Sequence, residues 1–360
     1  MDLRQATAGY ERWLAQQVPV RRADLDLKHR LMARDAFSFL RATFYRWAQQ
    51  WPELCPECRT APTVLAVGDL HVENFGTWRD AEGRLIWGVN DFDETTVLPY
   101  TQDLVRLATS ALIAIEEARL TLARRRGCQA ILEGYVEGLR RGGGAAVLAE
   151  RYRWLRELAV ERLKDQRPFW DAMRALRTAG SLEPALRRRL EAALPPRASA
   201  PRFVHRQAGL GSLGRLRVAA LAEWQGGMVA REAKPLAPSA WLWAHGRGRG
   251  AIRAAQLLRR AVRVADPYYT QHGRWLVRRL APDCSRIELA SLPRGHDEGR
   301  LLWMMGWETA NMHLGTPERR RAVLGDLARR RPSWLGKAAE RCAEAVARDW
   351  RKWSKINRDD

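Results

Sequence analysis

Apolar residues along this chain follow two spacings, which alternate in blocks. A spacing of three to four residues predicts helices over 24–52, 103–126, 129–139, 145–163, 182–194, 251–264, 301–314, 317–330 and 336–355. Short apolar or alternating runs predict strands at 63–67, 85–89, 203–205, 216–224, 228–233, 274–280 and 286–292. Helical blocks combined with separate groups of short strands indicate the α+β fold class.

Polar side chains follow the first two strand-like runs. A turn at 80–83 is expected to join these runs as a hairpin. Asp69 and Asn74 come after the first run, and Asp91 and Asp93 come after the second. A hard cation such as Mg²⁺ takes oxygen ligands and keeps several waters for a phosphate-bearing substrate. Carboxylate and amide oxygens at adjoining strand ends therefore predict a magnesium site.

A glycine-rich loop lies between two later runs, 203–205 and 216–224. It contains Gly209, Gly211, Ser212 and Gly214. Alternation of apolar and other residues after the loop favours a strand over the helix of a dinucleotide-binding domain. Without side chains to intrude, the backbone N–H groups of such a loop can close over phosphates.

The strand that follows the glycine loop carries two basic residues, Arg231 and Lys234. Either could neutralise the phosphates of a nucleotide. They differ in strand parity, so only one of them can point inward in a regular strand. The pattern leaves open which of the two does so.

The early block resembles the catalytic segment of kinase-fold phosphotransferases, and most closely the aminoglycoside and choline kinase branch. The matching residues are G-D-L-H-V-E-N at 68–74 and N-D-F-D at 90–93. Nearly the whole chain also resembles the bacterial family catalogued as domain of unknown function 2252. That family carries G-D-x-H-x-x-N-F-G, N-D-F-D-E and a W-D-x-x-R-L-like block, in which Gln102 stands here for the usual tryptophan.

The resemblance implies ATP-dependent phosphoryl transfer to a hydroxyl group of a small molecule. The sequence does not identify that molecule. Asp69 would receive or orient the acceptor proton, and His71 would support the loop. Asn74 and Asp91 would hold Mg²⁺, and Asp93 or Glu94 would support a second ion. Gly209, Gly211, Ser212 and Gly214 would cover the phosphates of ATP, with Arg231 or Lys234 beside them.

Two further residues belong to this interpretation. In kinase-like proteins an aspartate at the position of Asp103 braces the catalytic loop, although a plain helix cap would explain it too. Arg106, one turn later, could pair with an acidic residue of the site.

The kinase-like parts occur in rotated order, which predicts a circularly permuted protein-kinase-like fold with a small antiparallel-sheet lobe and a larger, mainly helical lobe. Residues 1–196 would form the catalytic-loop and helical lobe, residues 197–295 the nucleotide-binding sheet lobe, and residues 296–360 the helices that rejoin the first part. The first boundary follows Pro195 and Pro196, which end a helical pattern.

The 360-residue chain has a net charge of +21, so anionic partners are expected. Nucleic-acid binding is possible on charge alone, although no recognition motif accompanies it. Five cysteines form no disulfide framework, and Cys55 and Cys58 have zinc-knuckle spacing without a second pair. No apolar run is long enough for a membrane span, and a cytoplasmic location is expected.

Two rival functions remain open. The first is a non-catalytic pseudokinase or a basic nucleic-acid-binding scaffold, because Arg231 stands at the usual lysine position and the segment 251–264 offers no glutamate partner. The second is a metallophosphoesterase, since Asp69 and His71 also resemble the start of such sites, with 295–297 as a faint second motif.

Overall fold

The computed structural model describes residues 2–117, 119–149, 151–161, 165–284 and 296–356. The described chain is α+β, and its paired strands form three antiparallel sheets. One pairs β1 (Thr63–Ala66) with β4 (Thr96–Pro99). Another has the order β2 (Phe75–Arg79), β3 (Leu85–Val89), β5 (Ala146–Val147). The five-stranded sheet has the order β6 (Arg202–His205), β7 (Val218–Trp224), β8 (Gly227–Pro235), β10 (Trp275–Leu280), β9 (Thr270–His272).

Helices make up the rest of the regular structure. Those before the five-stranded sheet are α1 (Leu3–Gln17), α2 (Arg22–Met32), α3 (Ala36–Ala42), α4 (Phe44–Leu54), α5 (Pro56–Arg59), α6 (Tyr100–Glu116), α7 (Arg124–Arg141), α8 (Arg153–Glu161), α9 (Arg167–Arg174) and α10 (Pro184–Ala193). Within and after the sheet come η1 (Leu210–Ser212), α11 (Ala240–Ala244), α12 (Ala254–Arg260), α13 (His296–His313), η3 (Pro317–Arg319), α14 (Arg320–Arg329) and α15 (Trp334–Ile356). None of the described helices combines the length and apolar character that a bilayer crossing requires.

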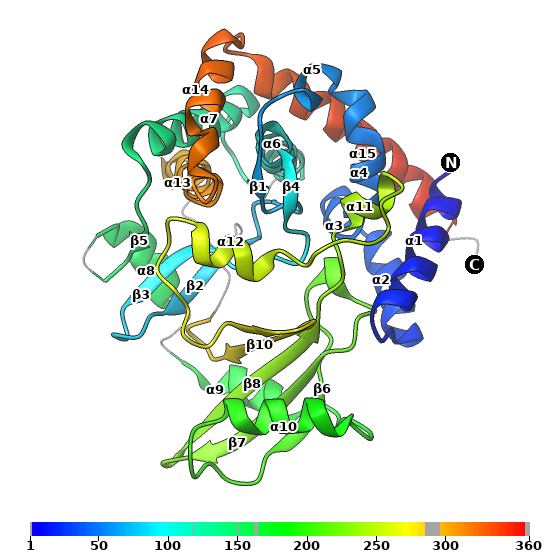
Figure 1. The fold of residues 1–360 in the computed structure, drawn as a ribbon, viewed down its shortest axis with the longest axis vertical. Helices are drawn as coiled ribbons and strands as arrows, with labels where there is room; N and C mark the ends of the chain where they lie inside the picture. Colours follow the sequence, from blue (N-terminus) through cyan, green and yellow to red (C-terminus); the bar gives the residue numbers. More distant parts are fainter. Residues whose placement is uncertain (1, 118, 150, 162–164, 285–295, 357–360) are drawn as a thin grey trace.

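The molecule has two parts, which Figure 1 shows one above the other. We call the five-stranded sheet with α9 and α10 the sheet lobe, and the helices around α6 the helical lobe. The helix α6 is the centre of the helical lobe, because every residue from Tyr100 to Ala114 is buried. In the sheet lobe, α9 and α10 contribute to separate apolar clusters, with Met173 in one and Leu186 and Leu190 in the other. The acidic segment after β3 lies where the two lobes meet.

Three local expectations need correction. The run 63–67 does not pair with 85–89: β1 pairs with β4, and the turn at 80–83 joins the unforeseen strand β2 to β3. The helix expected over 24–52 is three helices, since Asp35 caps α3 by accepting a hydrogen bond from Ser38 N at 2.6 Å. The helix expected over 145–163 begins only at Arg153, because β5 pairs with β3 first.

Several other elements match in kind and differ in length. The helix expected over 103–126 ends at Glu116, and α12 covers only Ala254–Arg260 of the segment 251–264. The strand expected at 286–292 lies outside the described residues.

Helices α7 and α13 pack unusually closely because glycines line their contact. A Cβ on Gly134 would overlap the backbone carbonyl of Trp303, and a Cβ on Gly306 would overlap that of Ile131. Close approach of helix backbones requires small residues of this kind. The contact matters for the site because α13 ends at His313, which contacts Asp103 on α6.

We expect Gly134→Ala to lower the free energy of unfolding by about 1–3 kcal/mol, because the added methyl group forces the two helix backbones apart. Chemical denaturation followed by circular dichroism measures the change. Gly325→Ala in α14 is the matched control: its Cβ would meet only the end of the Arg329 side chain, at 3.7 Å. That substitution should stabilise the protein by about 0.5–1 kcal/mol, by helix propensity. Equal effects of the two substitutions would contradict the proposed close packing.

Candidate functional site

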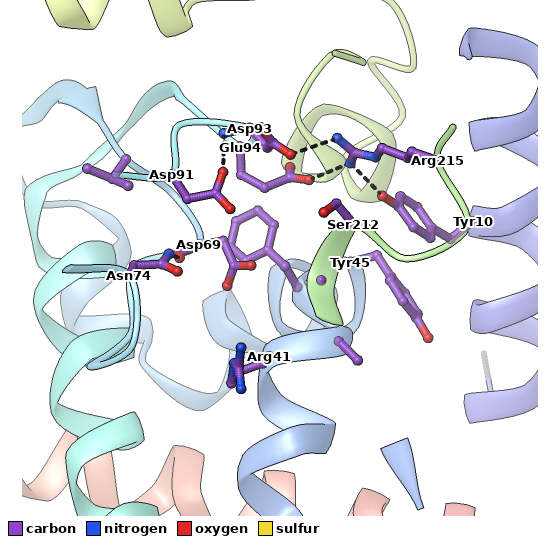
Figure 2. Close-up of a pocket in the computed structure, with 14 residues that line it drawn as sticks. Tyr10, Arg41, Tyr45, Asp69, Asn74, Asp91, Asp93, Glu94, Ser212 and Arg215 are labelled. Carbon is purple, nitrogen blue, oxygen red and sulfur yellow. Dashed lines mark hydrogen bonds and ion pairs between the residues drawn. The ribbon is translucent and has the colours of Figure 1, made fainter. Parts of the chain in front are cut away.

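A narrow pocket forms where the segment after β1 and β3 meets the glycine-rich loop. From the first segment it is lined by Asp69, Asn74, Asp91, Asp93 and Glu94, and from the second by Gly211, Ser212 and Arg215. Figure 2 shows the carboxylates and Ser212 converging on the same space. The free space suits an ion and a few waters more than a whole nucleotide. Segments far apart in the sequence therefore contribute to one site.

Asp69 is held by a buried arginine. Arg106 Nε donates to Asp69 Oδ1 at 2.7 Å, and Nη2 of the same arginine donates to that oxygen and to Leu40 O. The expectation that Arg106 pairs with an acidic residue of the site is confirmed. The other carboxylate oxygen, Oδ2, lies 3.4 Å from the position of a Cβ on Gly211. One oxygen of Asp69 is thus anchored, and the other faces the glycine loop.

The backbone before Asp69 requires glycine. Gly68 has φ +88°, and a Cβ there would overlap the carbonyl of Glu94. This close approach brings the end of β1 directly against the acidic turn that follows β3. The geometry therefore explains why glycine precedes Asp69 in the sequence.

Asp103 on α6 holds the backbone of the loop that leads to Asp69. Its carboxylate accepts hydrogen bonds from Val67 N at 2.7 Å and Gly68 N at 2.9 Å. Asp103 is not the cap of α6, because that helix already begins at Tyr100. His313 Nε2 lies 3.2 Å from Asp103 Oδ2, and His313 Nδ1 lies 2.8 Å from the Tyr135 hydroxyl. A chain of polar contacts therefore runs from α7 through α13 to the loop.

His71 and Asn74 shape the turn after Asp69. Glu73 N donates to His71 Nδ1 at 3.2 Å, and the ring packs edge-on against Phe37. His71 therefore contacts the loop and Phe37, and its role in supporting the loop stays a prediction. The side-chain amide of Asn74 donates to Asp69 O, and its backbone carbonyl accepts from Asn90 N at 3.0 Å. Asn74 therefore links the turn to the segment that carries Asp91.

The acidic residues after β3 are paired with basic residues from the sheet lobe. Lys234 Nζ lies 3.2 Å from Asp91 Oδ1 and 2.5 Å from Asp93 Oδ1. Arg215, which follows the glycine loop directly, lies 3.4 Å from Asp93 and 3.3 Å from Glu94. These ion pairs join the two lobes at the pocket.

The choice between the two basic residues of β8 is decided by strand parity. Lys234 faces the acidic residues, whereas Arg231 points to the other face of the sheet. There its guanidinium donates to Ala193 O at 2.9 Å and lies over the Tyr268 ring at 4.5 Å. The expectation that Arg231 could contact phosphate is therefore wrong for this arrangement.

The four residues of the glycine loop have different environments. Gly211 and Ser212 line the pocket. Gly209, with φ +71°, lies beside the Arg217 guanidinium. Gly214, with φ +99°, packs on Leu25 of α2, and its carbonyl accepts from Arg21 N at 2.8 Å. Gly214 thus anchors the loop to the helical lobe.

Burial changes the proton affinity of several groups in and around the pocket. It raises the pKa of Asp69, even though Arg106 acts in the opposite direction. Burial also raises the pKa of Glu94 to about 7 and lowers that of Lys28, which donates to Gly211 O at 3.3 Å, to about 8. Lys28 and Arg215 were not foreseen; only the position of Arg215 next to Gly214 offered a signal in the sequence.

The donor set is compatible with magnesium. The described residues contain no group of three or more His, Cys, Asp or Glu side chains arranged to hold a metal by themselves. Magnesium needs fewer, because one or two protein oxygens with waters and substrate phosphates complete its shell. Asp91 and Asn74, which line the same pocket, offer such oxygens; Asp91 Oδ1 is paired with Lys234, and Asp93 is paired with both Lys234 and Arg215.

We expect Asp103→Asn to lower the free energy of unfolding by about 1–3 kcal/mol, because an amide NH₂ cannot accept both loop N–H groups and leaves a buried donor unpaired. Urea denaturation measures the loss. The exposed Asp171→Asn makes the same chemical change without a buried partner and should have little effect. A loss no greater in Asp103→Asn than in that control would show that Asp103 does not brace the loop.

Comparison with known proteins shows which family the chain belongs to. Residues 21–202 match the model of a family described as uncharacterized protein conserved in bacteria (DUF2252). Neither a curated protein nor a solved structure matches the chain. The matched region includes the whole acidic segment and its bracing helix α6, and it covers half of the sequence. The chain therefore belongs to this conserved bacterial family, DUF2252.

Proposed function

We propose that this protein is an ATP- and Mg²⁺-dependent phosphotransferase with a circularly permuted kinase-like fold, acting on a hydroxyl group of a small molecule. One observation carries the proposal. The glycine-rich loop lines one pocket with Asp69, Asp91 and Asp93, and Lys234 of the sheet lobe is ion-paired with two of these carboxylates, those of Asp91 and Asp93. Phosphoryl transfer relies on such a meeting of donors for phosphate with oxygen ligands for Mg²⁺.

A contact at the end of α13 supports the permuted order. In the kinases that the chain resembles, a helix ending in a histidine leads into the catalytic loop. Here α13 comes late in the sequence, yet its last residue, His313, contacts Asp103, which binds the amides of Val67 and Gly68. The helix end and the loop are thus spatial neighbours without being joined by the chain.

In the proposed reaction the acceptor oxygen bonds to the terminal phosphorus of ATP while the bond from that phosphorus to the ADP oxygen breaks. The hydroxyl proton passes to Asp69 Oδ2, since Oδ1 is held by Arg106. Lys234 would neutralise phosphate charge. Mg²⁺, held through Asp91 and Asn74, would supply charge neutralisation across the phosphates.

Binding of a nucleotide requires the lobes to separate at their ion pairs. Lys234 now occupies Asp91 and Asp93, and the pocket is too narrow for a nucleotide. A triphosphate with Mg²⁺ offers each of these residues a new partner of opposite charge, so the exchange need not leave a buried charge unpaired.

The rival functions have less support. Arg231 was the main argument for a non-catalytic protein, and Lys234 now takes the position that a phosphate-binding lysine would need. A metallophosphoesterase would require a larger cluster of metal ligands than the described residues contain. In its second motif, Gly295 lies outside those residues. No observation favours a nucleic-acid scaffold beyond the net charge.

We expect Asp91→Asn and Lys234→Met each to reduce Mg²⁺-dependent ATP turnover by about 10²–10³-fold, because each removes a charge that the triphosphate needs. A coupled ADP-release assay measures turnover, and a screen of hydroxyl compounds with labelled ATP identifies the acceptor. Arg231→Gln, on the opposite face of the same strand, is the control and should retain most activity. Wild-type levels in both site variants would refute the proposal, and ATP binding without turnover would indicate a pseudokinase.

The pH dependence of turnover tests the role of Asp69. Burial raises its pKa, so the carboxylate becomes protonated, and unable to accept a proton, at a higher pH than an ordinary aspartate. Activity should therefore fall on acidification with a midpoint clearly above the usual value of about 4. A kcat profile from pH 4 to pH 9 measures the midpoint. A midpoint at or below the ordinary value would exclude Asp69 as the proton acceptor.

A further inference from the structure

Three arginines surround one buried glutamate in the sheet lobe. Glu232 on β8 has a side chain with no exposed surface. Arg206 contacts its Oε2 at 2.6 Å, whereas Arg217 and Arg278 contact its Oε1 at 2.9 Å and 2.8 Å. We call these four residues the arginine cluster. They come from four different strands or strand ends (β6, β7, β8 and β10), so the cluster exists only in the folded sheet.

The arginine cluster lies on the face of the sheet that carries Lys234. Glu232 and Lys234 are two residues apart on β8, and Arg278 is the cross-strand partner of Glu232 on β10. The cluster also reaches the glycine loop, because Arg217 Nη2 donates to Ser212 Oγ. It therefore continues the phosphate-binding side of the pocket.

The charges of the arginine cluster do not balance. Within the cluster three guanidinium groups contact one carboxylate, and Arg217 is only 3% exposed. The carboxylates of Asp91 and Asp93 act on Arg217, and that of Asp91 on Arg278, without being ion-paired with them. Burial lowers the pKa of Arg217, so its positive charge is costly there. In the described part of the chain, Arg217 Nε finds no hydrogen-bond partner. The direct contacts of the cluster therefore leave guanidinium charge and an N–H donor with which a bound anion would pair.

An anion has access to this surplus. The side chains of Arg206 and Arg278 are 23% and 25% exposed, so the cluster opens to solvent on their side. Guanidinium groups bind phosphate oxygens through paired N–H donors, with more geometric specificity than an ammonium group offers. Glu232 holds the arginines in place so that little side-chain freedom is lost on binding.

We infer that the arginine cluster binds the polyphosphate chain of the nucleotide, in addition to Lys234 and the glycine loop. This inference rests on the proposed function and assigns the ligand class of its sheet-lobe side. Two residues on the same face of β8 thus have different partners. Glu232 is paired with the three arginines, whereas Lys234 is paired with Asp91 and Asp93.

Titration calorimetry of the full chain with inorganic triphosphate, without Mg²⁺, tests the inference. Arg206→Gln and Arg278→Gln are the informative variants, because both side chains are partly exposed and their loss is compatible with folding. Each should weaken triphosphate binding by about tenfold, as expected for a lost charge-assisted contact. Arg279→Gln is the matched control: it is the next residue of β10, on the opposite face, and contacts Asp283. It should bind triphosphate within about twofold of wild type.

The outcomes separate this inference from the proposed function. Triphosphate binding by Arg206→Gln and Arg278→Gln that equals that of the control overturns the arginine cluster as a phosphate site, even if Mg²⁺·ATP turnover depends on Asp91. Arginine-dependent triphosphate binding without any ATP turnover keeps the cluster as a polyphosphate site and removes the phosphotransferase. Melting temperatures of all variants, measured alongside, establish that each is folded.

Discussion

The carboxylates that follow β1 and β3 are buried or half-buried, and basic side chains from elsewhere in the chain stabilise their charged form. Arg106 comes from α6 to Asp69, and Arg215 and Lys234 come from the sheet lobe to Asp91, Asp93 and Glu94. Removing a buried charge from water is repaid only by a well-placed partner. The pairs made by Arg215 and Lys234 join the two lobes, and together with the Arg106–Asp69 pair inside the helical lobe they define the pocket.

Local patterns predicted four strands of the sheet lobe, β6, β7, β8 and β10, because short alternating runs bounded by glycine and proline carry their own signal; the short strand β9 was not predicted. Which strands pair with one another was harder to predict from the sequence. The run F-G-T-W-R at 75–79 has a glycine at its second position that weakens the strand pattern, and this strand was not predicted. Without it, the turn at 80–83 was assigned to the wrong pair of strands. The spacing of apolar residues over 24–52 likewise continues across the cap at Asp35.

The acidic side of the pocket was predicted because its residues are close in the sequence. Asp69, Asn74 and Asp91 follow strand ends at short intervals and meet as expected. Parity showed that Arg231 and Lys234 face opposite ways, but the direction of each depends on what covers the two faces of the sheet. The arginines around Glu232 gave no sequence signal, since they meet only through strand register.

The glycine contact between α7 and α13 ties helix packing to the geometry of the loop. Tyr135 directly follows Gly134 on α7, and it holds the ring of His313 at the end of α13. His313 in turn touches the carboxylate that binds the amides before Asp69. Spacing between two helix axes is thus transmitted through three side chains to the backbone that presents the carboxylate. The absence of a side chain at Gly134 therefore affects the position of the backbone that carries Asp69.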